Sequence, residues 1–296
     1  MLKRSLAHMN RLAGKIAPRH VAKIALAFAV MLGISAPAPC VSAESALERI
    51  VDSGVIRIGV CDDLAPMSYL DERGHRQGYD IEIAKRVAAD LLGSEARIEL
   101  VLLAPQDRLT ALDDDAADVL FCNFTVTPER SEVVDFATPY LTAHTGVLSS
   151  NNDPVTDLSQ LRDKKLIVVT GTVADGYFTK NHPEIPLQKY DSDREAFEAL
   201  MSGAGTAMAQ DNHILHAWAA RNPGFAVSMP ELGEPLLVAP AVKKGDTRMR
   251  EWLNQEIAGL AFDGFLLKAY ELHLAPVFGA GMTPQQAIPG YVEHDK

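Results

Sequence analysis

Residues 118–140 read DVLFCNFTVTPERSEVVDFATPY, and this stretch decides how the chain is organised. An apolar run over 117–122 predicts a short buried strand. Thr127 and Pro128 suit the N-cap and the first position of a helical turn that carries Arg130. The strand would deliver polar side chains to its carboxyl end, and the turn would bring an arginine close to them.

The same alternation of strand and helix extends along the chain on both sides of this stretch. Apolar, β-branched runs predict strands at 55–60, 96–103, 166–169, 185–190, 206–209 and 236–242. Helical spacing of apolar residues predicts helices at 79–92, 108–112, 194–203 and 249–260. Strands that alternate with helices imply βαβ units, so we expect an α/β protein with mostly parallel sheets.

The alternation restarts after Leu158 and returns near residue 236, which predicts two lobes joined by two crossings. We expect lobe 1 to comprise residues 44–147 and 239–271, and lobe 2 to comprise residues 148–238. The hinge crossings should lie near 146–149 and 236–239. Residues 272–296 are interpreted as a poorly organised C-terminal tail.

The first 43 residues have the features of an export signal. They contain six basic and no acidic residues, an apolar run at 24–34, and Val41-Ser42-Ala43 as a small-x-small cleavage site. The apolar run is shorter than the roughly 20 residues that span a bilayer. We therefore expect cleavage after Ala43 and a periplasmic protein. An uncleaved anchor, or a lipoprotein modified at Cys40, is the alternative.

The charge balance narrows the range of partners. The chain has 28 basic and 39 acidic residues, so removal of the six basic leader residues leaves 22 against 39, a net charge near −17. Such a surface argues against nucleic acid and anionic membranes as partners. His213 and His216 do not form a compact metal-ligand spacing, so neither a metal nor a cofactor is expected.

The predicted strand ends locate a ligand site. In open α/β sheets, ligands bind at the carboxyl ends of strands, where helix N-termini also point. These ends fall after Val60, Cys122, Val169 and Ala209. Arg130 follows the second of them, and its guanidinium has the fork geometry that matches a carboxylate.

A family resemblance makes the ligand class more specific. The order and spacing of Asn123 to Arg130, Val134-Asp135-Phe136 and Pro139-Tyr140 resemble the signature of the family 3 extracellular solute-binding proteins, with Gly78 to Ala84 and Val242 to Asp246 also similar. The resemblance covers most of the chain after the leader. It implies a type II periplasmic-binding fold and a polar amino acid as ligand. It also implies membrane permease subunits of an ABC importer as partners, and we expect a monomer.

The resemblance implies individual roles when it is carried over residue by residue. Arg130 would hold the α-carboxylate, with help from Thr125 and from backbone N–H groups at Gly171 and Thr172. Asp211 would accept the α-ammonium, together with the backbone carbonyl of Asn123. The alternatives are a surface salt bridge for Arg130, a helix N-cap for Asp211 and a plain strand position for Thr125.

Arg108 is a second candidate cation of the site. Acidic-amino-acid receptors of the family resemble this chain in having an Arg here that reaches a side-chain carboxylate. Two arginines in one cleft need two anionic groups, which favours glutamate or aspartate as the ligand. Pairing of Arg108 with Asp107 or Asp113 is the alternative.

Cys61 and Leu64 depart from the family pattern and weaken the case for an acidic ligand. The position of Cys61 often carries a charged or polar ligand contact in the family, and that of Leu64 an aromatic ring. Cys61 and Cys122 end neighbouring predicted strands, so they can form a disulfide in an oxidising compartment. Two buried thiols are the alternative.

Two other classes of function remain open. Exported cyclohexadienyl dehydratases resemble this family, and an enzyme of that kind needs a positioned general acid such as His144 or Glu184. A sensory module that docks on a signalling receptor is the third hypothesis. The presence of Asp211 as an ammonium acceptor favours a non-catalytic receptor.

Overall fold

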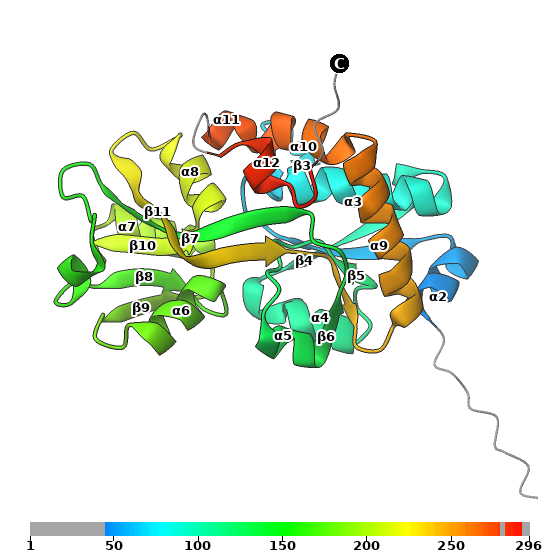
Figure 1. Cartoon of the computed structure of the whole chain (residues 1–296), viewed down its shortest axis with the longest axis horizontal. Helices are drawn as coiled ribbons and strands as arrows, with labels where there is room; N and C mark the ends of the chain where they lie inside the picture. Colours follow the sequence, from blue (N-terminus) through cyan, green and yellow to red (C-terminus); the bar gives the residue numbers. More distant parts are fainter. Residues whose placement is uncertain (1–44, 279–281, 292–296) are drawn as a thin grey trace, which may run out of the picture. The chain divides into compact units, whose positions relative to one another are not determined.

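The computed structural model describes residues 45–278 and 282–291. The predicted leader, its cleavage site and Cys40 lie outside the described residues. Two five-stranded sheets, each flanked by helices, form the type II periplasmic-binding fold (Figure 1). The strand–helix alternation of the sequence therefore predicted the α/β class and the two-lobed fold correctly. The expectation of mostly parallel sheets was wrong, because each sheet contains two parallel and two antiparallel strand pairs.

The first sheet has the strand order β4-β1-β5-β12-β6. β1 pairs in parallel with β4 and β5, whereas β12 runs antiparallel to β5 and β6. The strands are β1 (Ile56–Cys61), β4 (Ile98–Leu103), β5 (Val119–Leu120), β6 (Val134–Phe136) and β12 (Ala241–Lys243). A small hairpin accompanies this sheet, formed by β2 (Tyr69–Leu70) and β3 (Arg76–Gln77).

The helices of the first lobe cover both faces of this sheet, and Figure 1 shows α3 and α4 on opposite sides of it. α3 buries an apolar stripe that includes Ile81, Ala84 and Val87. This stripe was predicted from its 3.6-residue spacing. The helices are α2 (Ala46–Ser53), α3 (Tyr79–Leu92), α4 (Arg108–Asp113), α5 (Pro128–Val133), α9 (Thr247–Phe262) and α10 (Phe265–His273).

The second sheet has the order β11-β7-β10-β8-β9 and mixes parallel with antiparallel pairs. Its core consists of fully buried β-branched and aliphatic side chains such as those of β8. Its strands are β7 (Leu141–Ser150), β8 (Leu166–Val169), β9 (Leu187–Tyr190), β10 (Ala207–Asp211) and β11 (Phe225–Val238). Its helices are α6 (Val173–Asn181), α7 (Asp193–Met201) and α8 (Asn212–Ala219).

The first lobe boundary differs from the expected one. β6 ends at Phe136 in the first sheet, and β7 pairs with β10 and β11 of the second sheet along its whole length from Leu141. The first crossing therefore lies between 136 and 141 rather than at 147. The second crossing lies between Val238 and Ala241, close to the expected position at 236–239.

The C-terminal segment is also better organised than expected. After α10 come the short helices α11 (Ala275–Phe278) and α12 (Pro284–Ala287). These helices and the residues beside α12 contribute buried side chains to the main core, among them Phe278, Met282 and Ile288. The hydroxyl of Tyr270 donates to the carbonyl of Met282. Residues 272–291, as far as they are described, therefore pack as part of the fold because their apolar side chains close over α10 and α8.

Candidate functional site

A small cavity at the carboxyl ends of the strands brings together residues of both lobes. Its volume is about 10 Å³, close to the space that one water molecule needs. Lobe 1 contributes Leu64, Arg108, Asn123, Thr125 and Arg130, and lobe 2 contributes Thr172, Val173, Asp193, Gln210 and Asp211. Seven of these ten residues are candidates named from the sequence, and they meet although they are up to 147 positions apart.

The turn after β5 places Asn123 at the floor of this cavity. Asn123 has φ of 43°, the left-handed conformation that asparagine tolerates better than most residues. Its backbone N–H donates to Oδ2 of the buried Asp80 at 2.7 Å. The hydroxyl of Tyr140 donates to the other oxygen of Asp80, also at 2.7 Å. Asp80 thus fixes the backbone of Asn123 from behind the site.

Arg130 lies on the short helix α5, which begins as the sequence predicted. The Thr127 hydroxyl accepts from the backbone N–H of Arg130 at 3.2 Å, and Pro128 occupies the first helical position. The guanidinium donates to the carbonyl oxygens of Thr125 at 2.8 Å and Gly171 at 2.9 Å. Arg130 therefore connects the two lobes, and it is not held in a surface salt bridge with Glu129 or Glu132.

An aromatic ring, burial and a second arginine surround Arg130 and affect its pKa. Its guanidinium lies 4.5 Å from the ring centroid of Phe124, a cation–π geometry that Arg108 shares at 5.5 Å. Burial, reinforced by the repulsion of Arg108, lowers the pKa of Arg130 to about 10. Both arginines remain cationic at neutral pH, so two positive charges face the same small space.

Asp211 ends β10 and lies fully inside the cleft. Its Oδ2 accepts from the side-chain amide of Asn123 at 2.7 Å, and burial raises the pKa of its carboxyl. The carboxylate makes no hydrogen bond to the first turn of α8 among the described residues, although Asp211 occupies the N-cap position. The side chain is therefore directed into the cleft, where it can accept a hydrogen bond from an ammonium group.

Gly171 and Thr172 immediately precede α6, and their backbone N–H groups bond within lobe 2. The N–H of Gly171 donates to Asp175 at 3.3 Å, and the N–H of Thr172 donates to the carbonyl of Val169 at 3.3 Å. Gly171 adopts φ of 78°, which directs its carbonyl at Arg130. In this state of the protein, lobe 2 offers Arg130 an acceptor. The N–H of Gly171 bonds to a side chain of α6, and the N–H of Thr172 closes the turn after β8.

Arg108 is buried, with 4% of its surface exposed, and its Nε has no hydrogen-bond partner among the described residues. Burial lowers the pKa of Arg108, while the carboxylates of Asp193, Asp211 and Asp80 act in the opposite direction. Neither Asp107 nor Asp113 is among the carboxylates that raise the pKa of Arg108. The acidic residues that compensate Arg108 are distant along the chain, and the fold brings them close to it.

Asp193 and Gln210 are site residues that the sequence analysis missed. Asp193 is the first residue of α7 and accepts from the side-chain amide of Gln210 at 2.7 Å. Burial raises the pKa of Asp193 to about 6. The strand-end rule could have identified Asp193, because it follows β9 by three residues, but β9 was not treated as a strand that faces the cleft.

Cys61 and Cys122 are joined by a disulfide, with their Cα atoms 4.8 Å apart. The bond ties the end of β1 to the residue before Asn123. Cys61 lines a neighbouring cavity of about 190 Å³, which shares Leu64, Arg108 and Asp193 with the small cavity. Cys61 therefore lies beside the site, whereas Leu64 lines it directly.

Three further observations concern metal ions, membrane spans and the candidate general acids in the part of the chain that the structure describes. Within residues 45–278 and 282–291, no group of three or more His, Cys, Asp or Glu side chains could hold a metal ion. The same residues include no helix that is long and apolar enough to cross a membrane. His144 and Glu184, the candidate general acids, do not line the small cavity, and Glu184 contacts His182 at 3.3 Å.

Two lobes that meet over a buried pair of arginines and a pair of aspartates define a solute-binding protein of the periplasmic type. Residues 56–275 match the family model of the bacterial extracellular solute-binding proteins, family 3. This match covers most of the chain, and the chain belongs to that family.

Three relatives illustrate the similarity. A solute receptor for L-cysteine of Neisseria gonorrhoeae is 46% identical with a TM-score of 0.80, and the match covers 83% of this chain and 99% of the receptor. The cysteine-binding protein of Campylobacter jejuni is 40% identical, with the same coverage and TM-score. The ABC transporter glutamine-binding protein GlnH of Bacillus subtilis is 29% identical over 75% of this chain and 82% of its own length.

Proposed function

We propose that this chain is the exported receptor for a small, neutral polar α-amino acid, with L-cysteine as the leading candidate, and that it delivers this ligand to an ABC importer. The charge balance of the site is the observation that carries the proposal. Arg108 and Arg130 are balanced by Asp193 and Asp211 within the same cavity. A zwitterionic ligand without a charged side chain preserves that balance, whereas buried uncompensated charge is costly.

Each head group of such a ligand has a complementary partner. The α-carboxylate would replace the carbonyl oxygens that now accept from the Arg130 guanidinium, in the geometry that arginine prefers. The α-ammonium would replace the amide of Asn123 at Asp211. The two cysteine-binding relatives among the solved structures support L-cysteine as the ligand.

Glutamate or aspartate is the second candidate, and the pKa of Asp193 is the observation that favours it. Burial raises this pKa to about 6, so protonation of Asp193 below that pH removes one negative charge beside Arg108. A side-chain carboxylate could then compensate Arg108 in its place. We expect any acidic ligand to bind better near pH 5 than at pH 8, whereas a neutral ligand should lack this preference.

Export and hinge closure complete the proposed mechanism. The basic, apolar leader with its cleavage site after Ala43 supports secretion to the periplasm. The ligand would take over the contacts by which Arg130 and Asn123 now reach lobe 2, and so would bridge the lobes in the closed arrangement. The closed monomer would then dock on the permease subunits. A sensory receptor is the alternative to a transport receptor. A strain that lacks the gene should lose uptake of the ligand if the protein serves transport, and should retain uptake if it serves only sensing.

The test is a thermal-shift screen of the mature protein against the twenty amino acids, small dicarboxylates and prephenate, followed by calorimetric titration. A ligand that binds only the folded protein stabilises it by mass action and so raises the melting temperature. At a ligand concentration of 100 times Kd, the free energy of unfolding rises by about 2.7 kcal/mol. We expect cysteine or a similarly small neutral amino acid to give the largest shift at pH 7.5. Consumption of prephenate without a shift from any amino acid would instead indicate a dehydratase.

A further inference from the structure

A disulfide borders the amino-acid site, and one of its two cysteines can be approached from the cleft. Cys61 lines the neighbouring cavity of about 190 Å³, whereas Cys122 is fully buried in the core. Leu64, Arg108 and Asp193 line both this neighbouring cavity and the small cavity of the amino-acid site. Cys61 is therefore the cysteine of the pair that a molecule in the cleft can reach.

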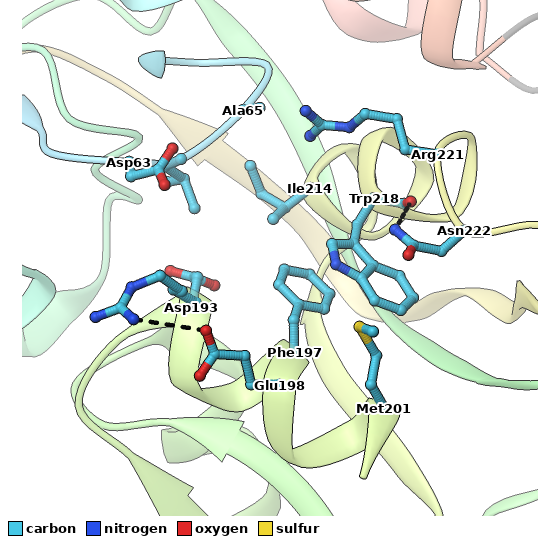
Figure 2. A pocket seen from close by; sticks show the side chains of 12 residues that line it. Asp63, Ala65, Asp193, Phe197, Glu198, Met201, Ile214, Trp218, Arg221 and Asn222 are labelled. Carbon is cyan, nitrogen blue, oxygen red and sulfur yellow. Dashed lines mark hydrogen bonds and ion pairs between the residues drawn. The ribbon is translucent and has the colours of Figure 1, made fainter. Parts of the chain in front are cut away.

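A larger pocket lies next to the neighbouring cavity and gives small molecules access to it. This pocket has a volume of about 390 Å³, and it is lined mainly by the loop at 63–65 after β1 and by the helices α7 and α8. Asp63 and Asp193 line both spaces, and Figure 2 shows them on opposite sides of one end of the larger pocket. The exposed side chains of Arg194 and Glu198 also line the larger pocket, so it opens to solvent.

The residues shared by the small cavity and the neighbouring cavity form the wall between the amino-acid site and Cys61. Neither proposed head-group partner, Arg130 or Asp211, lines the neighbouring cavity. The head groups are thus held elsewhere in the site, and the side chain of a bound amino acid is free to point toward this shared wall. In L-cysteine, the group at the end of that side chain is a thiol.

The shared wall carries groups that can activate a thiol. The thiolate is the nucleophile in disulfide exchange, and a cation beside a thiol lowers its pKa from about 8.5. Arg108 supplies the cation, since it is buried and its Nε has no hydrogen-bond partner among the described residues. Asp193 supplies a proton acceptor, because burial raises its pKa to about 6, closer to that of a thiol. Transfer of the thiol proton to Asp193 moves one negative charge to sulfur and leaves the charge balance of the site unchanged, which avoids a costly uncompensated charge.

We propose that Cys61 is a site of reversible thiol–disulfide exchange with thiol-containing amino acids that bind in the cleft. The ligand thiolate attacks Sγ of Cys61, a bond forms between these two sulfur atoms, and the bond between Cys61 and Cys122 breaks. Cys122 leaves as a thiolate and takes up the proton that the ligand gave to Asp193. One disulfide is consumed and one is formed, so the step needs no external oxidant or reductant. Cys122 stays beside Cys61 in the core, so it can attack the adduct in turn and release the amino acid.

This inference rests on the proposed function, because it requires a thiol-containing amino acid in the proposed amino-acid site. It adds a chemical step to recognition by charge. A neutral amino acid without a thiol would use the same head-group partners, but it would form no covalent adduct with Cys61.

The experiment compares L-cysteine with D-cysteine, whose thiols have the same intrinsic reactivity. The mature protein is incubated with each enantiomer at pH 7.5, acid stops the exchange, and mass spectrometry measures the fraction of chains with one cysteinyl group on Cys61. Cys122→Ser gives a second measurement in which no internal thiol reverses the adduct. In that variant Cys61 is first converted to a mixed disulfide with 2-mercaptoethanol, which the incoming cysteine displaces. Both measurements are repeated with Arg130→Lys and with the exposed control Arg162→Lys.

We expect L-cysteine to form the adduct at least about tenfold faster than D-cysteine, because the head-group partners hold the L enantiomer with its thiol at the shared wall. Arg130→Lys should reduce this preference to about twofold or less, and Arg162→Lys should leave it unchanged. Calorimetric titration of Cys61→Ser/Cys122→Ser with L-cysteine measures binding without exchange. If this variant binds L-cysteine, equal rates for the two enantiomers, a preference that survives in Arg130→Lys, or no adduct on Cys61 overturns the exchange site and leaves the proposed function standing. If L-cysteine binds neither this variant nor the unaltered protein, the proposal of a cysteine receptor falls as well.

Discussion

The side-chain amide of Asn123 donates to Oδ2 of Asp211 at 2.7 Å, and this hydrogen bond joins the carboxyl end of a strand in one sheet to that of a strand in the other. The amide oxygen of Asn123 also contacts Nε2 of His213 at 3.1 Å. One residue of lobe 1 thereby makes two hydrogen bonds to lobe 2. Asp80 holds its backbone in the required conformation, so the contact is prepared before the lobes close.

Asn123→Gly should shift the ligand-free protein toward an open form. The change removes both cross-lobe hydrogen bonds but tolerates the left-handed backbone, so about 2 kcal/mol of closure free energy should be lost. Distances between spin labels on the two lobes measure the shift, with Asn152→Gly as an exposed control. Asn123→Ala should lower the free energy of unfolding by about a further 1 kcal/mol, because alanine disfavours φ of 43°. Unchanged inter-lobe distances in Asn123→Gly would contradict this role.

Arg130→Lys should weaken amino-acid binding by roughly a hundredfold. Lysine keeps the positive charge but lacks the fork that contacts the carbonyls of Thr125 and Gly171 and would hold a carboxylate. Calorimetric titration with the best ligand of the screen measures the loss. Arg162→Lys, on the exposed surface of lobe 2, serves as the matched control. If Arg130→Lys binds the ligand within threefold of the unaltered protein, Arg130 does not hold the ligand carboxylate.

Asp193→Asn should change ligand selectivity rather than abolish binding. The substitution removes the first of the carboxylates that compensate Arg108, so a ligand that brings its own side-chain carboxylate gains. We expect the affinity for glutamate or aspartate relative to cysteine to rise about tenfold at pH 7.5. The control Asp163→Asn removes an exposed charge on the same lobe. A constant ratio of affinities would mean that Asp193 does not set the charge balance.

His213 should make the protein less stable in acid. Burial lowers its pKa to about 3 in the folded protein, against about 6.5 when unfolded, so the unfolded state binds more protons between these values. The stabilising contribution is complete above pH 6.5 and declines as the pH falls toward 3. When the pH is lowered from 7.5 to 4.5, the free energy of unfolding measured in urea should fall by about 2 kcal/mol more for the unaltered protein than for His213→Gln.

The buried carboxyls do not obscure this comparison. The pKa values of Asp80 and Asp193 are raised to about 6, so their contribution to stability changes in the opposite direction over the same pH range. They are present in both proteins and cancel in the difference. Parallel pH profiles for His213→Gln and the unaltered protein would refute the assignment.

Removal of the disulfide should destabilise the protein without preventing ligand recognition. The bond closes a loop between residues 61 positions apart, which corresponds to about 4 kcal/mol in the chain-entropy description. Cys61→Ser/Cys122→Ser should lower the denaturation midpoint accordingly. Thiol titration of the unaltered mature protein under denaturing, non-reducing conditions should find no free thiol. Two titratable thiols would mean that the bond does not form in the exported protein.

Much of the fold was predictable because it depends on local patterns. The spacing of Ile81, Ala84 and Val87 predicted α3 with its bounds, and Thr127 with Pro128 predicted the start of α5. The lobe boundary was not predictable in the same way. β7 belongs to the second sheet from Leu141 because it pairs with β10 and β11, and a pairing partner leaves no local mark on a strand's own sequence.

The order of Arg130 and Asp211 along the chain, with the signature around them, was sufficient to predict an amino-acid receptor. The sequence also supplied Leu64, Arg108, Asn123, Thr125 and Thr172 as cleft candidates, because strand ends and helix starts are locally marked. It favoured an acidic ligand because two arginines in one cleft need two anionic groups, although Cys61 and Leu64 weakened that case. Only the tertiary structure brought Asp193 beside Arg108, and electrostatic compensation depends on distance in space rather than along the chain.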